Sequence, residues 1–146
     1  MLSVVTAMVL LAAAPAEPPG RFAFRSYGSE QGLENLSVLA IVQDREGFLW
    51  VATEDGLYRY DGDRFHRFGA EDGLPSNQMT SLTLGDDGRL WAGTFRGVAL
   101  FDDGRFRPVA KSLPDLRIKG LAAAPGGALW VATGAGLFFE SSRELR

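Results

Sequence analysis

One motif recurs three times in phase along the chain: Gly-x-Leu-Trp-x-x-Thr-x-x-Gly, followed by Leu or Val. The three copies span residues 47–57, 88–98 and 127–137. Their tryptophans are the three tryptophans of the protein, and they recur at nearly equal intervals: Trp50, Trp91 and Trp130. A period of about 40 residues is typical of stacked supersecondary units. The chain is therefore predicted to be a repeat protein.

The residues between these landmarks read as short strands separated by turns rich in Asp and Gly, and no segment shows a helical stripe of apolar residues. The expected strands are 36–43, 48–53, 57–60 and 64–68, then 78–84, 89–94, 98–102 and 105–109, then 117–123, 128–133 and 137–140. A leucine precedes each tryptophan at a constant spacing: Leu33, Leu74 and Leu113. Four antiparallel strands in about 40 residues form a propeller blade. The predicted fold is all-β, a partial β-propeller of about three four-stranded antiparallel blades.

The blades are expected to occupy residues 31–68, 72–109 and 113–140. Ahead of them, residues 21–27 match the position of a fourth strand, because Phe24 lies one repeat length before Phe65. This segment is predicted to be a lone strand. In a ring closed by strands from both ends, it would pair with the last blade.

The first sixteen residues carry no charged side chain and end in a small-x-small pattern. We therefore expect residues 1–16 to be a signal peptide that exports residues 17–146 to the periplasm of a Gram-negative bacterium. An uncleaved membrane anchor and a misplaced start codon are the alternatives. No other segment of the sequence is a candidate membrane span. The protein contains no cysteine, so disulfides are excluded.

The composition excludes one class of partner. The net charge is −3, and no basic run is present. A protein that binds nucleic acid needs a basic surface. No nucleic-acid partner is therefore expected.

Residues 31–65 and 72–106 resemble two-component regulator propeller repeats, and the resemblance extends over residues 21–139. It implies the periplasmic ligand-sensing part of a bacterial signalling protein whose output module is a histidine kinase, a hybrid kinase or a diguanylate cyclase. Such an output module would lie outside this chain. A small-molecule or oligosaccharide ligand is implied.

Three blades are too few to close a ring, since small propellers have four. The chain is therefore expected to be the N-terminal fragment of a longer sensor. Its unclosed blade faces would be apolar patches through which copies could self-associate. Whether this piece folds alone is left open.

No catalytic residue, metal site or cofactor is predicted. The tryptophans are expected in the core, and the acidic residues of the turns suit hairpins better than calcium loops. His66 is the only histidine and is expected to face solvent. If any residues bind a ligand, we expect loop residues that differ between units: Glu54, Asp55, Phe95 and Arg96.

These observations favour a non-catalytic, ligand-sensing segment of a two-component signalling protein. The alternative is a fragment of a secreted propeller enzyme or of a carbohydrate-binding module. That alternative predicts clusters of charged residues or histidines at loop positions of the missing blades, and the present chain has no such cluster.

Overall fold

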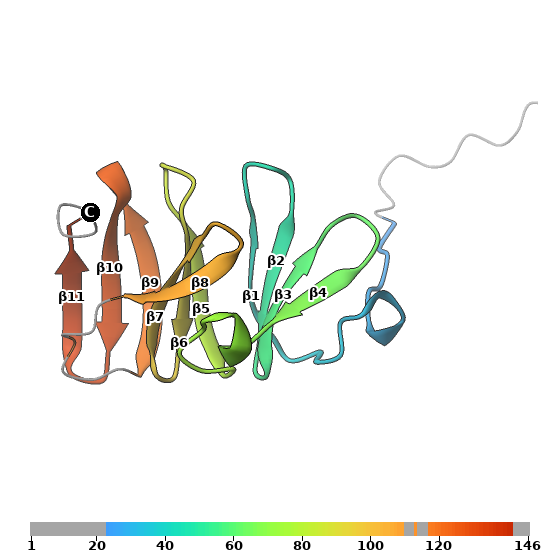
Figure 1. Cartoon of the computed structure of the whole chain (residues 1–146), viewed down its shortest axis with the longest axis horizontal. Helices are drawn as coiled ribbons and strands as arrows, with labels where there is room; N and C mark the ends of the chain where they lie inside the picture. The colour runs from blue at the N-terminus through green and yellow to red at the C-terminus, as the bar shows by residue number, and fades with distance from the viewer. Residues whose placement is uncertain (1–22, 110–112, 114–116, 142–146) are drawn as a thin grey trace, which may run out of the picture.

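A computed structural model describes residues 23–109, 113 and 117–141. In these residues the chain forms strands and three short 3₁₀ helices (Figure 1). The strands are β1 (Val38–Gln43), β2 (Leu49–Thr53), β3 (Gly56–Tyr60), β4 (Phe65–Phe68), β5 (Met79–Leu84), β6 (Leu90–Thr94), β7 (Gly97–Asp102), β8 (Arg105–Val109), β9 (Ile118–Ala124), β10 (Ala128–Thr133) and β11 (Gly136–Glu140). The 3₁₀ helices are η1 (Ser29–Gln31), η2 (Ala70–Asp72) and η3 (Pro125–Gly127). The predicted all-β class is confirmed.

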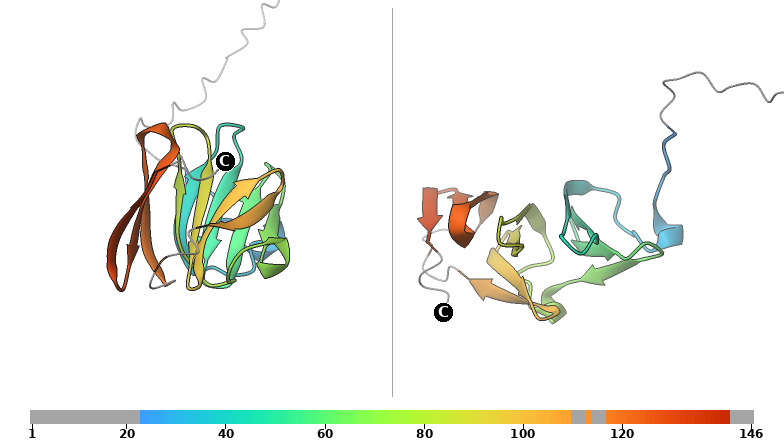
Figure 2. Two further views of the ribbon diagram at one scale, coloured as in Figure 1. Left: turned by 60° about the vertical axis from the view of Figure 1, so that its left-hand side comes forward. Right: turned by 90° about the horizontal axis from the view of Figure 1, so that it is seen from above.

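The strands form three antiparallel sheets, ordered β1-β2-β3-β4, β5-β6-β7-β8 and β9-β10-β11. Within each sheet, consecutive strands are hydrogen-bonded neighbours, as tight turns between antiparallel strands require. Strand β1 contacts β5, and β5 contacts β9, so the sheets stand side by side as blades (Figure 2). The predicted blade architecture is confirmed, with four, four and three strands in the described residues.

The segment before the first sheet differs from the prediction. A strand was expected over residues 21–27, but residues 23–28 have no strand structure. An extended segment needs a partner strand to satisfy its backbone N–H and C=O groups. None of the described strands pairs with it. The side chain of Phe24 is 95% exposed.

Two of the three repeated tryptophans join neighbouring sheets. Trp50 and Trp91 are each 1% exposed. Trp50 packs with the core residues of the second sheet, and Trp91 packs with those of the third. Trp130 was also expected in the core, but it is 42% exposed and lies against Phe139 of its own sheet. The reason is that none of the described sheets follows the third one.

Two of the repeated leucines, Leu33 and Leu74, each follow a 3₁₀ turn that ends in Gly-Leu. In the turn η2, the side chain of Asp72 accepts a hydrogen bond from the backbone N–H of Gly69 at 2.9 Å. Gly73 then adopts φ +97°, and Leu74 enters the core between the first and second sheets. A Cβ added to Gly73 would collide with the carbonyl oxygen of Phe106 in β8. The turn therefore docks closely on the outer strand of the sheet that follows it.

We predict that Gly73→Ala destabilises the protein more than Gly62→Ala. Both glycines have positive φ, at +97° and +105°, and alanine in that region costs about 1–2 kcal/mol. Only Gly73 has backbone atoms in the path of the new methyl group, while nothing lies within 4 Å of Gly62. Overpacking adds about 1–3 kcal/mol. Urea denaturation would measure both variants, and equal losses of stability would refute the close docking of the turn.

The predicted signal peptide, residues 1–16, lies outside the described residues. In the described part of the chain, no helix has the length and apolar character needed to cross a membrane.

Candidate functional site

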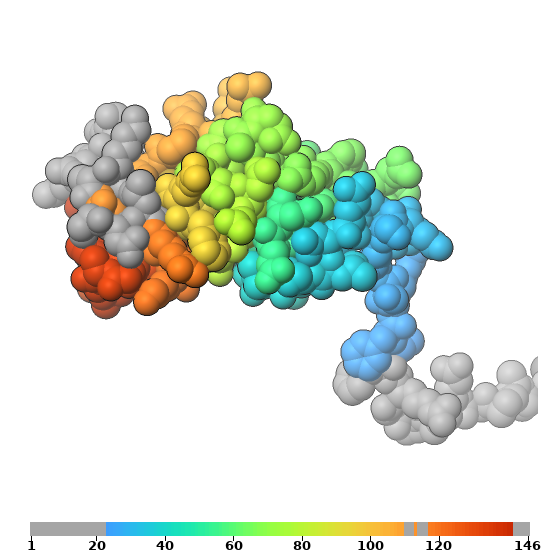
Figure 3. All heavy atoms as spheres, turned by 90° about the horizontal axis from the view of Figure 1, so that it is seen from below, coloured from blue at the N-terminus to red at the C-terminus, as the bar shows by residue number. Residues whose placement is uncertain are grey.

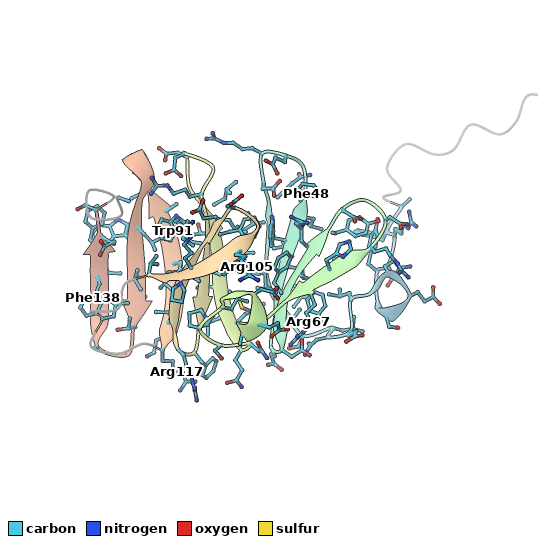
Figure 4. All side chains as sticks on the ribbon, in the orientation of Figure 1. Phe48, Arg67, Trp91, Arg105, Arg117 and Phe138 are labelled. Atoms are coloured by element: carbon cyan, nitrogen blue, oxygen red, sulfur yellow. The ribbon has the colours of Figure 1, made fainter. Side chains whose placement is uncertain are left out.

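A hollow of about 730 Å³ lies at one end of the sheets. It is formed where the turn after β2, the turn after β6 and the starts of the inner strands β5 and β9 meet. Figure 4 shows Arg117 at this end of the molecule. The lining residues are Leu39, Glu54, Gln78, Met79, Thr80, Phe95, Arg117, Ile118 and Lys119. The hollow therefore gathers residues from all three sheets.

The polar lining of this hollow is mixed in charge, with an excess of cations. Arg117 and Lys119 contribute two positive charges, and Glu54 contributes one negative charge. The guanidinium of Arg117 lies over the ring of Phe95, 4.4 Å from its centroid. An aromatic face beside two cations and hydrogen-bonding side chains suits a polar ligand that bears an acidic group.

The turns that border the hollow are held by the repeated threonine of the motif. The hydroxyl of Thr94 donates to the carbonyl of Gly97 at 2.9 Å and accepts from the N–H of Arg96 at 3.1 Å. Thr53 and Thr133 make the equivalent bonds in the other two sheets. Because these hydroxyls fix both ends of each turn, the residues between them can differ without loss of the turn.

We predict that Thr94→Val destabilises the protein while Thr80→Val does not. Thr94 is fully buried, and valine would leave two backbone groups without their partner, at a cost of about 1–3 kcal/mol. The hydroxyl of Thr80 is also buried but has no hydrogen-bond partner among the described residues, so its removal costs nothing comparable. The two urea unfolding midpoints would be compared with that of the unmodified chain. A neutral Thr94→Val would show that the threonine does not hold the turn.

The structure separates the four loop residues predicted as ligand contacts. Glu54 and Phe95 line the hollow, whereas Asp55 and Arg96 are not among its lining residues. The carboxylate of Asp55 instead accepts hydrogen bonds from the hydroxyls of Thr53 at 3.2 Å and Tyr58 at 3.3 Å. A ligand-binding role for any of the four stays a prediction.

The sequence analysis did not single out Gln78, Arg117 and Lys119 as site residues. Gln78 and Arg117 stand just before the first strand of their sheets, at equivalent positions of the repeat. Ser37 holds the same place in the first unit, just before β1. The signal that could have revealed Gln78 and Arg117 is a change of residue type, from Ser to Gln to Arg, at one position of the repeat.

His66 faces solvent, as predicted, and its Nε2 lies 2.8 Å from the carboxylate of Asp61. Backbone N–H groups of Arg64 and Asp63 lower the pKa of Asp61 below its ordinary value, and the His66 side chain lowers it further. In the second sheet, the guanidinium of Arg107 lies 2.7 Å from the carboxylate of Asp102, at the equivalent positions of the repeat. The histidine therefore belongs to a repeated surface pair. Among residues 23–109, 113 and 117–141, no group of three or more His, Asp or Glu side chains could hold a metal ion.

The comparisons with known proteins agree with this architecture. The pattern of the family described as two component regulator propeller matches residues 32–55 and 73–96. Histidine kinase P4 of Formosa agariphila is 48% identical over 44 residues, which cover 30% of this chain and 3% of that protein. The chain therefore carries two-component regulator propeller repeats, as its resemblance predicted.

Two solved structures from B. thetaiotaomicron share the fold. One is the extracellular domain of a protein described as a hybrid two component system, with a TM-score of 0.71 and 23% identity over 82% of this chain. The other is the extracellular domain of a protein described as a one component system, with a TM-score of 0.59 and 26% identity over 74% of this chain. This chain covers only 17% and 15% of those two structures.

Proposed function

We propose that the chain is a segment of an extracellular, ligand-sensing propeller of a bacterial two-component signalling protein. The proposal is supported by the propeller repeats at residues 32–55 and 73–96, and by the likeness to extracellular domains of signalling proteins. We propose the periplasm as the location of this segment. The contribution of the segment is recognition, and the output reaction belongs to another module.

The observation that carries the ligand proposal is the hollow at the meeting point of the turns and inner strands. The cations of Arg117 and Lys119 suit a carboxylate, and the face of Phe95 suits the apolar face of a sugar ring. Glu54 and Gln78 add groups that can hydrogen-bond to hydroxyls. We therefore propose an acidic oligosaccharide as the ligand.

The test uses trigalacturonic acid as the acidic probe and maltotriose as the neutral probe, with binding measured by isothermal titration calorimetry. We expect the acidic trimer to bind and the neutral one to bind more weakly or not at all. Lys119→Ala and Phe95→Ala should each weaken binding by about tenfold or more, because each removes a contact to a different part of the sugar. Arg105→Ala is the matched control, since it removes an exposed cation of β8 that does not line the hollow.

Equal binding of both trimers, or equal affinity of all four proteins, would contradict the proposed site. Binding should also weaken as salt rises, because the contact of the carboxylates with the two cations is electrostatic. Depolymerisation of the trimer during the titration would instead support a secreted propeller enzyme.

A further inference from the structure

The inner strand of each sheet carries a β-bulge near its start. The pairing register shifts by one residue in β1, in β5 and in β9. Each shift leaves one residue without a partner in the neighbouring strand: Leu39, Thr80 and Lys119. These residues are equivalent in the repeat, since each lies the same number of residues before the tryptophan of its unit. Bulges re-aim a side chain and are common next to active sites.

All three bulged residues line the hollow of about 730 Å³. Figure 3 views the molecule from the end at which this hollow lies, and atoms of the three sheets lie side by side there, coloured from cyan and green through yellow to orange. The second sheet has a described neighbour on each side, because β5 contacts both β1 and β9. The place of Thr80 in the hollow is therefore set by packing within the described part of the chain.

The positions on either side of the bulge keep one character in every sheet. The position before it is apolar and is occupied by Val38, Met79 and Ile118. The position after it is small and faces another small residue across the sheet, in the pairs Ala40 with Ala52, Ser81 with Gly93 and Gly120 with Ala132. A Cβ added to Gly93 would collide with the hydroxyl of Ser81. Packing and the close approach of two strands therefore fix both neighbours of the bulge.

The bulge position itself changes its chemistry from sheet to sheet. Leu39 presents an apolar side chain, Thr80 a short polar one and Lys119 a cation. Leu39 and Lys119 are exposed and Thr80 is half-buried, so none of the three fills a core position. A residue that neither pairs across the sheet nor packs in the core can be replaced without loss of the strand pairing.

We infer that the bulged residue is the specificity-determining residue that each sheet contributes to the hollow, so that Leu39, Thr80 and Lys119 together select the ligand. The inference rests on the proposed function, because it assigns roles within the same hollow. Lys119 supplies the contact with a carboxylate of the acidic sugar, and Leu39 contacts an apolar part of it. Thr80, in the middle sheet, leaves the space into which a longer side chain would extend.

The test moves the positive charge from one bulge to another and measures binding of trigalacturonic acid to the full chain by isothermal titration calorimetry, with maltotriose as the neutral probe. Lys119→Thr gives the third sheet the bulge residue of the second, and it should weaken binding of the acidic trimer by about tenfold. Adding Thr80→Lys should restore most of this loss, because the charge returns to the hollow at the neighbouring bulge.

Thr83→Lys is the matched control for Thr80→Lys. Thr83 lies in the same strand and is also half-buried, but it pairs with Trp91 and does not line the hollow. Three residues along a strand span about 10 Å, more than the screening length of about 8 Å at physiological salt. Added to Lys119→Thr, it should therefore leave binding weak. The exposed Ala122 of β9 gives a second control, Ala122→Lys, and urea unfolding checks that every variant is folded.

Rescue by Thr80→Lys and by neither control supports the inference. Equal binding by the three double variants would overturn it and would leave the acidic ligand in place. If the unmodified chain binds neither trimer, the proposed ligand is contradicted. The inference then stands only if Thr80→Lys alone confers binding of the acidic trimer, and it falls with the ligand if that variant does not bind either.

The first bulge is tested by alkylation, since the chain has no cysteine and a single thiol can be introduced. Leu39→Cys and Ile41→Cys are a matched pair, because both positions lie in β1 and are 45% and 64% exposed, and only Leu39 lines the hollow. Trigalacturonic acid at about ten times its dissociation constant should slow the reaction of Leu39→Cys with iodoacetamide by about tenfold and leave Ile41→Cys unchanged. Equal protection of the two thiols would contradict the role of the bulge.

Discussion

The structure depends on the packing of Trp50 and Trp91, each against the sheet that follows its own. Trp50 contacts three phenylalanine rings, with centroids 4.8–6.1 Å away, within the usual range for aromatic pairs. Two of these rings, Phe101 and Phe106, belong to the second sheet. A single sheet of four short strands has two apolar faces and cannot bury both by itself. Each unit is therefore stable only as part of a stack, and the tryptophan joins the stack.

The polar surroundings of this contact are not repeated. The indole N–H of Trp50 donates to Asp44 at 2.7 Å, and the guanidinium of Arg59 lies 5.5 Å from the indole. In the second unit the residue equivalent to Asp44 is Gly85, and the indole N–H of Trp91 has no partner among the described residues. The apolar contact is thus the shared requirement of the repeat. The hydrogen bond is an addition that one unit has and the next lacks.

Features set within one unit could be predicted from the sequence, whereas features set by the contact between units could not. The strands, turns and sheets follow from local patterns, because the Asp-Gly turns and the short apolar strands are specified within one unit. The exposure of Trp130 could not be read from its own unit, since burial depends on a neighbouring sheet. The hollow was equally hidden: Glu54 and Lys119 are far apart in sequence, and only the stacking of sheets brings them together. Two of the four predicted loop residues do line it, because their turns point to that end of the sheets.

The turns show how a fixed scaffold leaves room for recognition. In every described unit the threonine hydroxyl and backbone groups close the turn, so the turn forms whichever side chains the two residues between threonine and glycine carry. Those residues are Glu54 and Asp55 in the first unit, Phe95 and Arg96 in the second, and Gly134 and Ala135 in the third. The first two units therefore present charge and an aromatic ring at this end of the sheets, while the third presents almost no side chain. The positive lining of the third unit comes instead from Arg117 and Lys119, at the start of its inner strand. Each sheet thus contributes different chemistry through the same backbone, and the character of the hollow is set by which units stand next to one another.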